Sequence, residues 1–231
     1  MFSRLPSLPR QFYLRPTLVV ARDLLGKLLI RRRERTLLVA RIVEVEAYLG
    51  EKDPASHAYR GLTQRNSVMF GECGHLYVYF TYGMHFCCNV VTEPEGKGRA
   101  VLLRALEPIQ GEDVMARLRG FAIQEHNTVE STLAASTLVN LCNGPGKLCQ
   151  AFGISRVDNG IDLTGNALWI AEEPNSLPLR ISRTTRVGIK SGQSHRWRFF
   201  LRDSSFVSKG KPSGEGKTKT VRGEKRITTS S

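Results

Sequence analysis

The sequence lacks any long hydrophobic run. No apolar stretch approaches the roughly 18–20 residues that a membrane-spanning helix needs, so a membrane protein is disfavoured. Acidic residues are also scarce, because 21 Asp and Glu stand against 34 Lys and Arg and give a formal net charge of +13. This balance favours a polyanionic partner, although charge alone does not distinguish nucleic acid from an anionic membrane surface.

Paired cysteine motifs are absent as well. The five cysteines are odd in number, none stands in a CxxC pair, and Cys87 and Cys88 are adjacent in an apolar stretch. Buried reduced thiols fit this pattern better than a disulfide framework, which predicts an intracellular protein. The ligand spacing of a zinc site is missing too, so we expect neither a metal nor a cofactor. The N-terminus is basic, contains three prolines and lacks a signal-type apolar core; a short transit peptide remains an alternative.

Hydrophobic residues make up 41% of the 231 residues, enough for the core of one sizeable domain or two small ones. Periodicity and turn signals predict strands at 28–32, 37–48, 76–81, 85–91, 100–106, 167–171, 179–181 and 197–202. They predict helices at 17–27, 112–118 and 147–152. Thr17 is the expected N-cap of the first helix, Gly83 the corner of a hairpin and Gly153 the end of the last helix. The boundaries within 121–140 stay unassigned.

The composition changes at Lys209. Residues 209–231 contain seven basic and two acidic side chains, a net charge of +5, and neither an aromatic residue nor a leucine. We expect a disordered basic tail. Such a tail either adds salt-sensitive attraction to polyanions or is a solvated end without function.

Two carboxylates stand out in the stretch RIVEVEAY at 41–48. Alternation along a strand places Glu44, Glu46 and Tyr48 on one face, and the intervening apolar residues must face the core. The two carboxylates would lie roughly 7 Å apart. They are candidates for a general acid and base or for metal ligands, and the alternative is a solvated strand edge.

The segment 49–75 is a long, polar, glycine-containing loop, and such loops are often functional. It carries His57, Arg60, Arg65 and Asn66, whose side chains suit phosphates or the edges of bases. A lone loop histidine is also commonly just exposed.

The predicted hairpin that follows adds aromatic surfaces. Tyr77 and Tyr79 share one face. Tyr82 lies at the corner, where its large ring is either exposed or folded back onto a neighbour. Aromatic side chains among basic residues suit base stacking, worth roughly 1–3 kcal/mol per base.

Six motifs occur in order: EAYLG at 46–50, DPASHAYRG at 53–61, RNSVMFG at 65–71, YVYFTYGMHFCCNVV at 77–91, VLLRALEP at 101–108 and NGPGKLCQAFGI at 143–154. Together they resemble the methylpurine (3-methyladenine, or alkyladenine) DNA glycosylase family over about residues 11–207. Relatives in bacteria often have a proline in the turn where this chain has Glu72 and Cys73. The resemblance, joined to the predicted strands, implies a single α+β domain over 1–208, with a curved, mostly antiparallel sheet flanked by helices and a protruding β-hairpin.

The resemblance implies roles for individual residues. Glu46 would be the base that activates water, and Arg104 would lie close to that water. Four residues would form the base pocket: Tyr48, His57, Tyr79 and Asn89. Tyr82, with Met84 beside it, would intercalate into DNA, and Arg60 and Arg65 would contact the DNA backbone. Glu44 receives no role.

The implied function is that of a base-excision-repair DNA glycosylase, acting as a monomer on double-stranded DNA that contains damaged purines. Such an enzyme flips the damaged nucleotide out of the helix. No lysine neighbours Glu46 in the sequence, so we expect hydrolysis without β-lyase activity. The expected compartment is the cytoplasm or nucleoid of a bacterium, or the nucleus or a DNA-containing organelle of a eukaryote. The rival functions are a metal-dependent nuclease that uses Glu44 and Glu46, and a noncatalytic nucleic-acid-binding protein.

Overall fold

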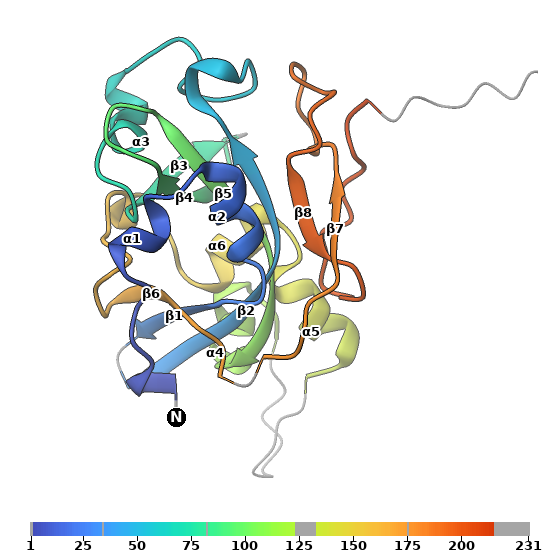
Figure 1. Ribbon diagram of the computed structural model, residues 1–231. Helices are drawn as coiled ribbons and strands as arrows, with labels where there is room; N and C mark the ends of the chain where they lie inside the picture. Colours follow the sequence, from blue (N-terminus) through green and yellow to red (C-terminus); the bar gives the residue numbers. More distant parts are fainter. Residues whose placement is uncertain (1, 34, 82, 123–132, 175, 215–231) are drawn as a thin grey trace, which may run out of the picture.

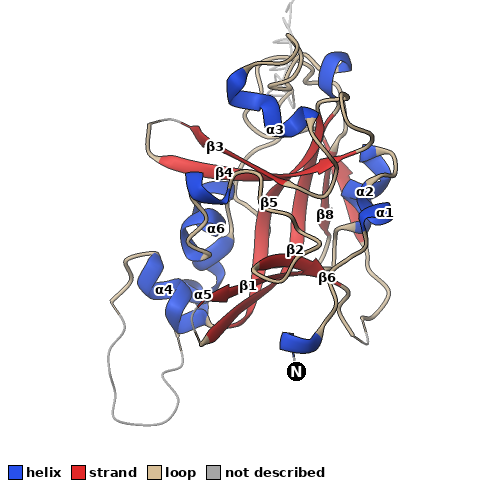
Figure 2. Cartoon of the chain, turned by 90° about the vertical axis from the view of Figure 1, so that its left-hand side faces the viewer, coloured by secondary structure: helices blue, strands red, loops and turns tan. Residues whose placement is uncertain are grey.

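The computed structural model of the chain describes residues 2–33, 35–81, 83–122, 133–174 and 176–214. Within these ranges, eight strands form one curved sheet with helices on both sides (Figures 1 and 2). Every strand pairing in these ranges is antiparallel. The α+β class and the mostly antiparallel sheet are therefore confirmed.

The sheet follows the order β3-β4-β5-β2-β1-β6, and β8 pairs with both β2 and β7. The strands are β1 (Leu28–Arg33), β2 (Thr36–Tyr48), β3 (Leu76–Thr81), β4 (His85–Thr92), β5 (Arg99–Gln110), β6 (Leu168–Ala171), β7 (Ile181–Thr184) and β8 (Arg198–Leu201). The long strands β2 and β5 lie at the centre and carry the carboxylates and the arginine singled out above. The short, late strand β8 lies beside the end of β2.

The helices are short: α1 (Arg10–Tyr13), α2 (Thr17–Asp23), α3 (Ser67–Phe70), α4 (Glu112–Leu118), α5 (Ala135–Cys142) and α6 (Pro145–Ala151). Figure 2 shows α4, α5 and α6 on one side of the sheet and α1 and α2 on the other. Apolar residues of α2, α4, α5 and α6 share one buried cluster with the central strands. No helix within the described residues is long and apolar enough to cross a membrane.

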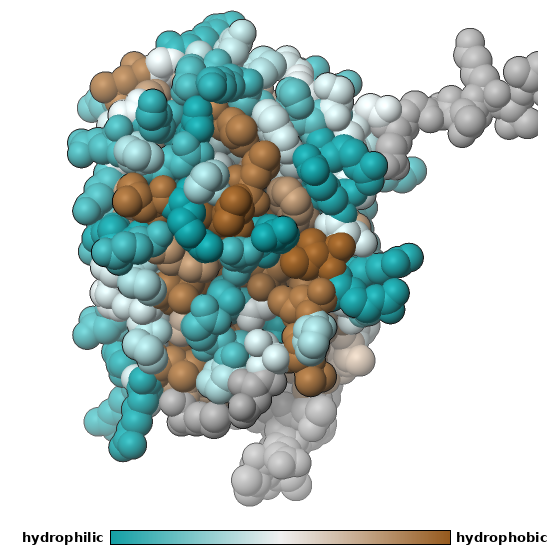
Figure 3. All heavy atoms as spheres, in the orientation of Figure 1, coloured by the Kyte–Doolittle hydropathy of each residue, from teal (hydrophilic) through white to brown (hydrophobic). Residues whose placement is uncertain are grey.

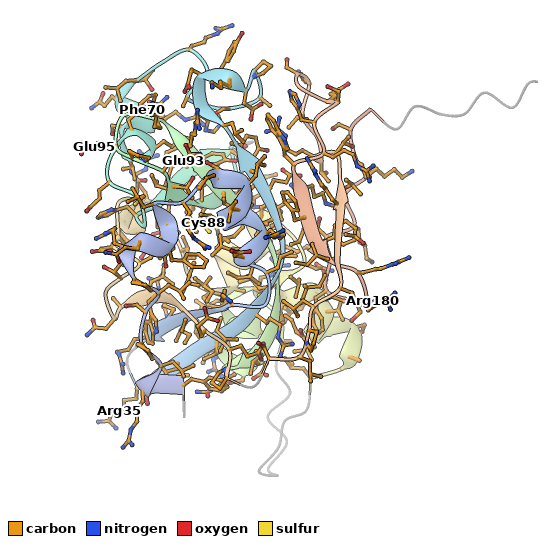
Figure 4. All side chains as sticks on the ribbon, in the orientation of Figure 1. Arg35, Phe70, Cys88, Glu93, Glu95 and Arg180 are labelled. Carbon is orange, nitrogen blue, oxygen red and sulfur yellow. The ribbon has the colours of Figure 1, made fainter. Side chains whose placement is uncertain are left out.

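The N-cap predicted for the first helix is wrong. Pro16 is the N-cap of α2, and Thr17 is the first helical residue. The carboxylate of Glu93, from the turn between β4 and β5, accepts a hydrogen bond from the Thr17 backbone N–H (2.9 Å) and one from its hydroxyl. Figure 4 shows Glu93 close to this helix. A carboxylate from a distant turn therefore satisfies the helix start, where negative charge is favourable.

Other boundaries moved for local reasons. Helix α6 begins at Pro145, two residues before the predicted start, because proline is well suited to the first helical position. Gly153 has φ +62 and its N–H donates to Gln150, which confirms the predicted end. The strand predicted at 179–181 lies at Ile181–Thr184 instead, where it pairs with β8. In the unassigned stretch, α5 begins at Ala135, and residues 123–132 lie outside the described residues.

The side chains of β2 alternate between two faces, as predicted, but neither face is exposed near the carboxylates. Glu44 and Glu46 are as fully buried as Val43, Val45 and Ala47 on the other face. The pairing with β5 shifts on both sides of Glu44, which marks a bulge of the kind common beside active sites. The interpretation of these carboxylates as a solvated strand edge is therefore wrong.

The cysteines agree with the prediction. All five are free and buried, and Cys88 lies within the interior in Figure 4, whereas Arg35 and Arg180 point outward. The predicted hairpin is confirmed as β3 and β4, with Gly83 at φ +66 between them.

The end of the described chain contacts the fold beyond residue 208. Ser213 donates to the carbonyl of Arg186 (2.7 Å), and Val187 forms a bridge with Pro212. Residues 215–231 lie outside the described residues, so the division of the chain at residue 208 stays a prediction.

The face of the molecule drawn in Figure 3 is largely hydrophilic. Apolar atoms interrupt it around the start of β7, where the exposed apolar side chains are Leu177 and Leu179 of the preceding segment and Ile181, the first residue of the strand.

Gly98 provides a test of this packing. Its φ is +59, and an added Cβ would lie 2.7 Å from the Ala58 Cβ and 2.8 Å from the Phe70 ring, whereas Gly96 (φ +85) meets no atom within 4 Å. We expect Gly96→Ala to cost about 1–2 kcal/mol of unfolding free energy through backbone strain alone. Gly98→Ala should cost about 1–3 kcal/mol more through overpacking. Urea unfolding measures both variants, and equal losses would contradict the close approach.

Candidate active site

Glu46 is fully buried on β2, between β5 and β8. Its Oε1 accepts a hydrogen bond from the backbone N–H of Val187 (2.7 Å), and its Oε2 accepts one from the Tyr48 hydroxyl (3.0 Å). The same Oε2 lies 3.3 Å from Nη1 of Arg104. Three different strands or loops therefore fix the orientation of one carboxylate.

Glu44 anchors the other end of this network. Its Oε1 accepts hydrogen bonds from Nε of Arg104 (2.8 Å), Nε of Arg198 (2.7 Å) and the Ser208 hydroxyl (2.9 Å). Its Oε2 accepts one from the Ser208 backbone N–H (2.6 Å). Arg104 thus bridges both carboxylates, and Glu44 joins β2, β5, β8 and the segment that ends at Ser208. Glu44, which the resemblance left without a role, is therefore an ion-pair partner of two arginines.

The two carboxylates have opposite pKa shifts. Burial raises the pKa of Glu46 and outweighs Arg104, the Val187 N–H and the Tyr48 hydroxyl. Burial also raises the pKa of Glu44, but Arg104 and Arg198 together outweigh it, so that pKa lies below its ordinary value. Neighbouring groups whose pKa values are driven apart are typical of acid and base assignments. Glu46 is the stronger proton acceptor of the pair, and Glu44 stays ionised as a structural anion.

A cavity of about 350 Å³ opens beside Glu46. Glu46 itself does not line it, but Tyr48, Arg104 and Val187 do, and each of them contacts the Glu46 carboxylate. The carboxylate therefore lies directly behind the cavity wall. The remaining lining residues come from the 49–75 loop, the hairpin, β5, the start of α6 and the loop after β7: Pro54, Ala55, His57, Tyr79, Thr81, Cys87, Leu102, Pro145, Gly188, Ile189, Lys190 and Ser191.

Aromatic rings form one side of the cavity. The ring centroids of His57 and Tyr79 are 4.5 Å apart at 78°, and those of Tyr77 and Tyr79 are 5.6 Å apart at 26°. A recess of about 20 Å³ continues between Tyr48, His57, Tyr79 and Asn89. All four residues that the resemblance assigned to a base pocket therefore meet at one place.

His57 is held on this wall by its neighbours. Its Nδ1 lies 3.1 Å from the Tyr77 hydroxyl. Partial burial of the ring and the charge of Arg65 both lower the pKa of His57, which favours the neutral imidazole at pH 7. Although the residue as a whole is exposed, its ring is not a free surface side chain.

The residues expected to contact DNA are exposed where the structure describes them. Met84 is 72% exposed beside the hairpin corner, and Tyr82 lies outside the described residues. Arg65 donates to the carbonyl of Phe80 (3.2 Å) and holds its guanidinium 5.9 Å from the Tyr79 ring centroid. Arg60 is exposed on the same loop as His57.

Sequence reasoning missed four residues of this site: Asp53, Arg186, Val187 and Lys190. Arg186 and Asp53 form a fully buried ion pair, and Lys190 lines the cavity. The stretch that contains the last three reads only as a polar connector, because its contacts to Ala47 and Glu46 of β2 span 139 and 141 positions of the chain. No lysine neighbours Glu46 in the sequence, whereas Lys190, from a distant part of the chain, lines the cavity beside it.

Comparison with known proteins places the chain in a class and then in a family. The family model described as Methylpurine-DNA glycosylase (MPG) matches residues 11–205, so the protein is a DNA glycosylase. The chain belongs to the methylpurine-DNA glycosylase family, which confirms the resemblance drawn from the six motifs.

Curated relatives agree with this assignment. A protein of Carboxydothermus hydrogenoformans is 47% identical over 203 residues, which cover 87% of this chain and 98% of the relative. One of Methanoculleus marisnigri is 48% identical over 206 residues, with 88% and 99% covered. One of Methanocella arvoryzae is 45% identical over 211 residues, with 90% and 98% covered. Each bears the name "Putative 3-methyladenine DNA glycosylase".

The Glu44 network predicts a large loss of stability on removal of one charge. Glu44→Gln leaves Arg104 and Arg198 with a neutral partner, and breaking a buried pair costs about 3–5 kcal/mol. Because the folded pKa of Glu44 is lowered, its contribution is fully present above the unfolded pKa and is lost as the pH falls through the folded one. The gap from the native chain should therefore be largest near neutral pH.

Urea unfolding at several pH values measures this gap. Glu51→Gln is the control, because Glu51 pairs with Arg99 at an exposed position and should cost little. Similar losses for the two variants would contradict the network.

Proposed function

We propose that this protein is a base-excision-repair DNA glycosylase that flips alkylated or deaminated purines out of duplex DNA and hydrolyses their N-glycosidic bond without lyase activity. The observation that carries the proposal is the buried Glu46 carboxylate behind a cavity with aromatic walls. The purines in question are of the 3-methyladenine, 7-methylguanine and hypoxanthine type.

Glu46 would act as the general base. A water molecule at the cavity wall attacks the anomeric carbon, its proton passes to Glu46, and the base leaves with the electron pair of the glycosidic bond. A positioned general base contributes roughly 10²–10⁴-fold. The negative charge of the carboxylate also stabilises an oxocarbenium-like sugar. Arg104 keeps the carboxylate aligned at 3.3 Å and shares its own charge with Glu44.

The aromatic side of the cavity would bind the extruded base. Tyr48 and Tyr79 offer ring faces, and the neutral His57 closes the slot between them. An N-alkylated purine is cationic, and a cation over such a ring gains roughly 0.5–2 kcal/mol. Asn89 lines the recess and would screen purines at their 2-position.

The hairpin would replace the extruded base in the helix. Extrusion costs a few kcal/mol, and apolar side chains inserted from the minor groove stabilise such distortions. Tyr82 is the proposed wedge and the exposed Met84 its neighbour. Arg60 and Arg65, both exposed, would contact the DNA backbone, and the net charge of +13 adds salt-sensitive attraction.

The rival functions fit the site less well. A nuclease that binds a metal between Glu44 and Glu46 would need free carboxylate oxygens, whereas Arg104 already lies between the two groups. EDTA distinguishes the two enzymes, because the nuclease would stop. A noncatalytic binder would leave every glycosidic bond intact in an abasic-site assay. Borohydride trapping tests the absence of lyase activity, since an imine at Lys190 would give a covalent adduct with abasic DNA.

The first experiment replaces the base. Glu46→Gln keeps the shape of the side chain and removes the proton acceptor, so we expect base release from single-lesion duplexes to fall at least about 100-fold. Binding of the same duplexes should persist. Glu107→Gln is the control, because its partner Arg41 stays paired with Glu173. Normal release of hypoxanthine or 3-methyladenine by Glu46→Gln would refute the assignment.

A second experiment uses pH. Because burial raises the pKa of Glu46, its ionised form exists only above a pKa higher than that of an ordinary glutamate. With 7-methylguanine the leaving base is already cationic, so protonation of the base does not affect the profile. We expect the single-turnover rate to fall as the pH decreases through that raised pKa. A rate that stays constant down to the ordinary glutamate range would contradict the role of Glu46.

A further inference from the structure

The most deeply buried ion pair of the described residues involves Arg186, the residue before Val187, whose backbone N–H donates to Glu46. Arg186 and Asp53 are both fully buried. Nη2 of Arg186 donates to Oδ1 of Asp53 at 2.7 Å, and Nη1 donates to the second oxygen, which makes the pair bidentate. A fully buried ion pair is costly to desolvate, so its presence needs a reason other than stability.

The guanidinium also lies in a column of rings. It is 4.6 Å from the centroid of Tyr48 and 5.0 Å from that of Trp197, and His195 stacks on Trp197 at 4.0 Å and 3°. Arg186 does not line the cavity, whereas Tyr48 does. The guanidinium therefore packs on the Tyr48 ring without itself lining the cavity.

The same residue fixes the backbone between the two site residues of β2. Nη1 of Arg186 donates to the carbonyl of Ala47 (3.0 Å), and the Ala47 N–H donates to the carbonyl of Trp197 (2.9 Å). Ala47 stands between Glu46 and Tyr48, so both side chains project from a peptide that is held on two sides.

Asp53 also fixes the backbone of the loop that carries His57. Its Oδ1 accepts a hydrogen bond from the Ala55 N–H (3.1 Å) and its Oδ2 one from the Leu49 N–H (3.3 Å). Ala55 lines both the cavity and its recess, two residues before His57. The ion pair therefore joins the loop that carries His57 to the loop that carries Val187.

We propose that Arg186 is a positioning residue of the active site: locked by Asp53 and Trp197, it sets the Tyr48 ring against the cavity and places the Val187 N–H on Glu46. This inference rests on the proposed glycosylase function. A lysine could not replace Arg186, because only a planar guanidinium forms two parallel hydrogen bonds and stacks on rings at the same time.

Arg186 should also affect the pH dependence of base release, because it acts on a contact of Glu46. The titratable groups that face Glu46 are Arg104 from β5, Glu44 and Tyr48 from β2, and Tyr79 from β3. The Val187 N–H is the one contact of Glu46 that Arg186 controls through the backbone, and it lowers the pKa of Glu46. Loosening it removes a stabilising contact from the ionised form, so the pKa of Glu46 rises and the ionised base is lost at a higher pH.

The test is Arg186→Lys in the full chain, with single-turnover release of 7-methylguanine followed from acidic to alkaline pH. We expect the acid limb to move to higher pH and the plateau rate above it to fall on the order of 100-fold, as misplacement of reacting groups does. Arg41→Lys is the matched control, because it also weakens a bidentate pair, with Glu173, at a position of β2 that does not line the cavity. Its acid limb and plateau should stay unchanged.

A merely structural role would lower the melting temperature or the active fraction and leave the acid limb in place, and that result would overturn the proposal. If Arg186→Lys does not fold, the same pH profile is measured on Trp197→Leu. This variant removes a ring that stacks on Arg186 and keeps the Arg186–Asp53 ion pair. We expect the same direction of shift with a smaller loss, and an unmoved acid limb would again overturn the proposal. A native chain that releases no base would overturn the proposed function itself, a result distinct from a normal native profile with an unshifted variant.

Discussion

The site depends on Arg104 lying between two buried carboxylates. Two like charges on one strand face cannot both leave water unless cations and N–H donors compensate them. Arg104 contacts both, Arg198 and Ser208 complete the shell of Glu44, and Glu46 is left with fewer donors. The asymmetry lowers the pKa of Glu44 and leaves that of Glu46 raised.

The part of the chain after β7 buries the two carboxylates, Glu44 and Glu46. Without β8 and its flanking loops, the carboxylate face of β2 would be open to water, as strand alternation alone suggests. Val187 and Ser208 supply backbone N–H groups to the two carboxylates, and Arg198 supplies charge. The enclosed face and the aromatic wall from the hairpin then meet at one cavity.

Local structure was predictable where local rules decide it. The hairpin of β3 and β4 follows from alternation and a glycine corner, and the helix predicted at 112–118 matches α4 at both ends. The failures have non-local causes. The backbone N–H at the start of α2 donates to Glu93, which lies in a turn far along the chain. The position of β7 follows from its pairing with β8 and not from the hydrophobicity of its own sequence.

The sequence by itself determined which side chains share a face of β2, which aromatic residues lie on the hairpin and which family the chain resembles, because spacing along a strand and ordered motifs are local properties. Only the tertiary structure decided that Glu44 and Glu46 are buried, that the Arg186 guanidinium lies over the Tyr48 ring and that Lys190 lines the cavity. These contacts join positions far apart in the chain, and burial and charge pairing depend on what the fold brings next to each group.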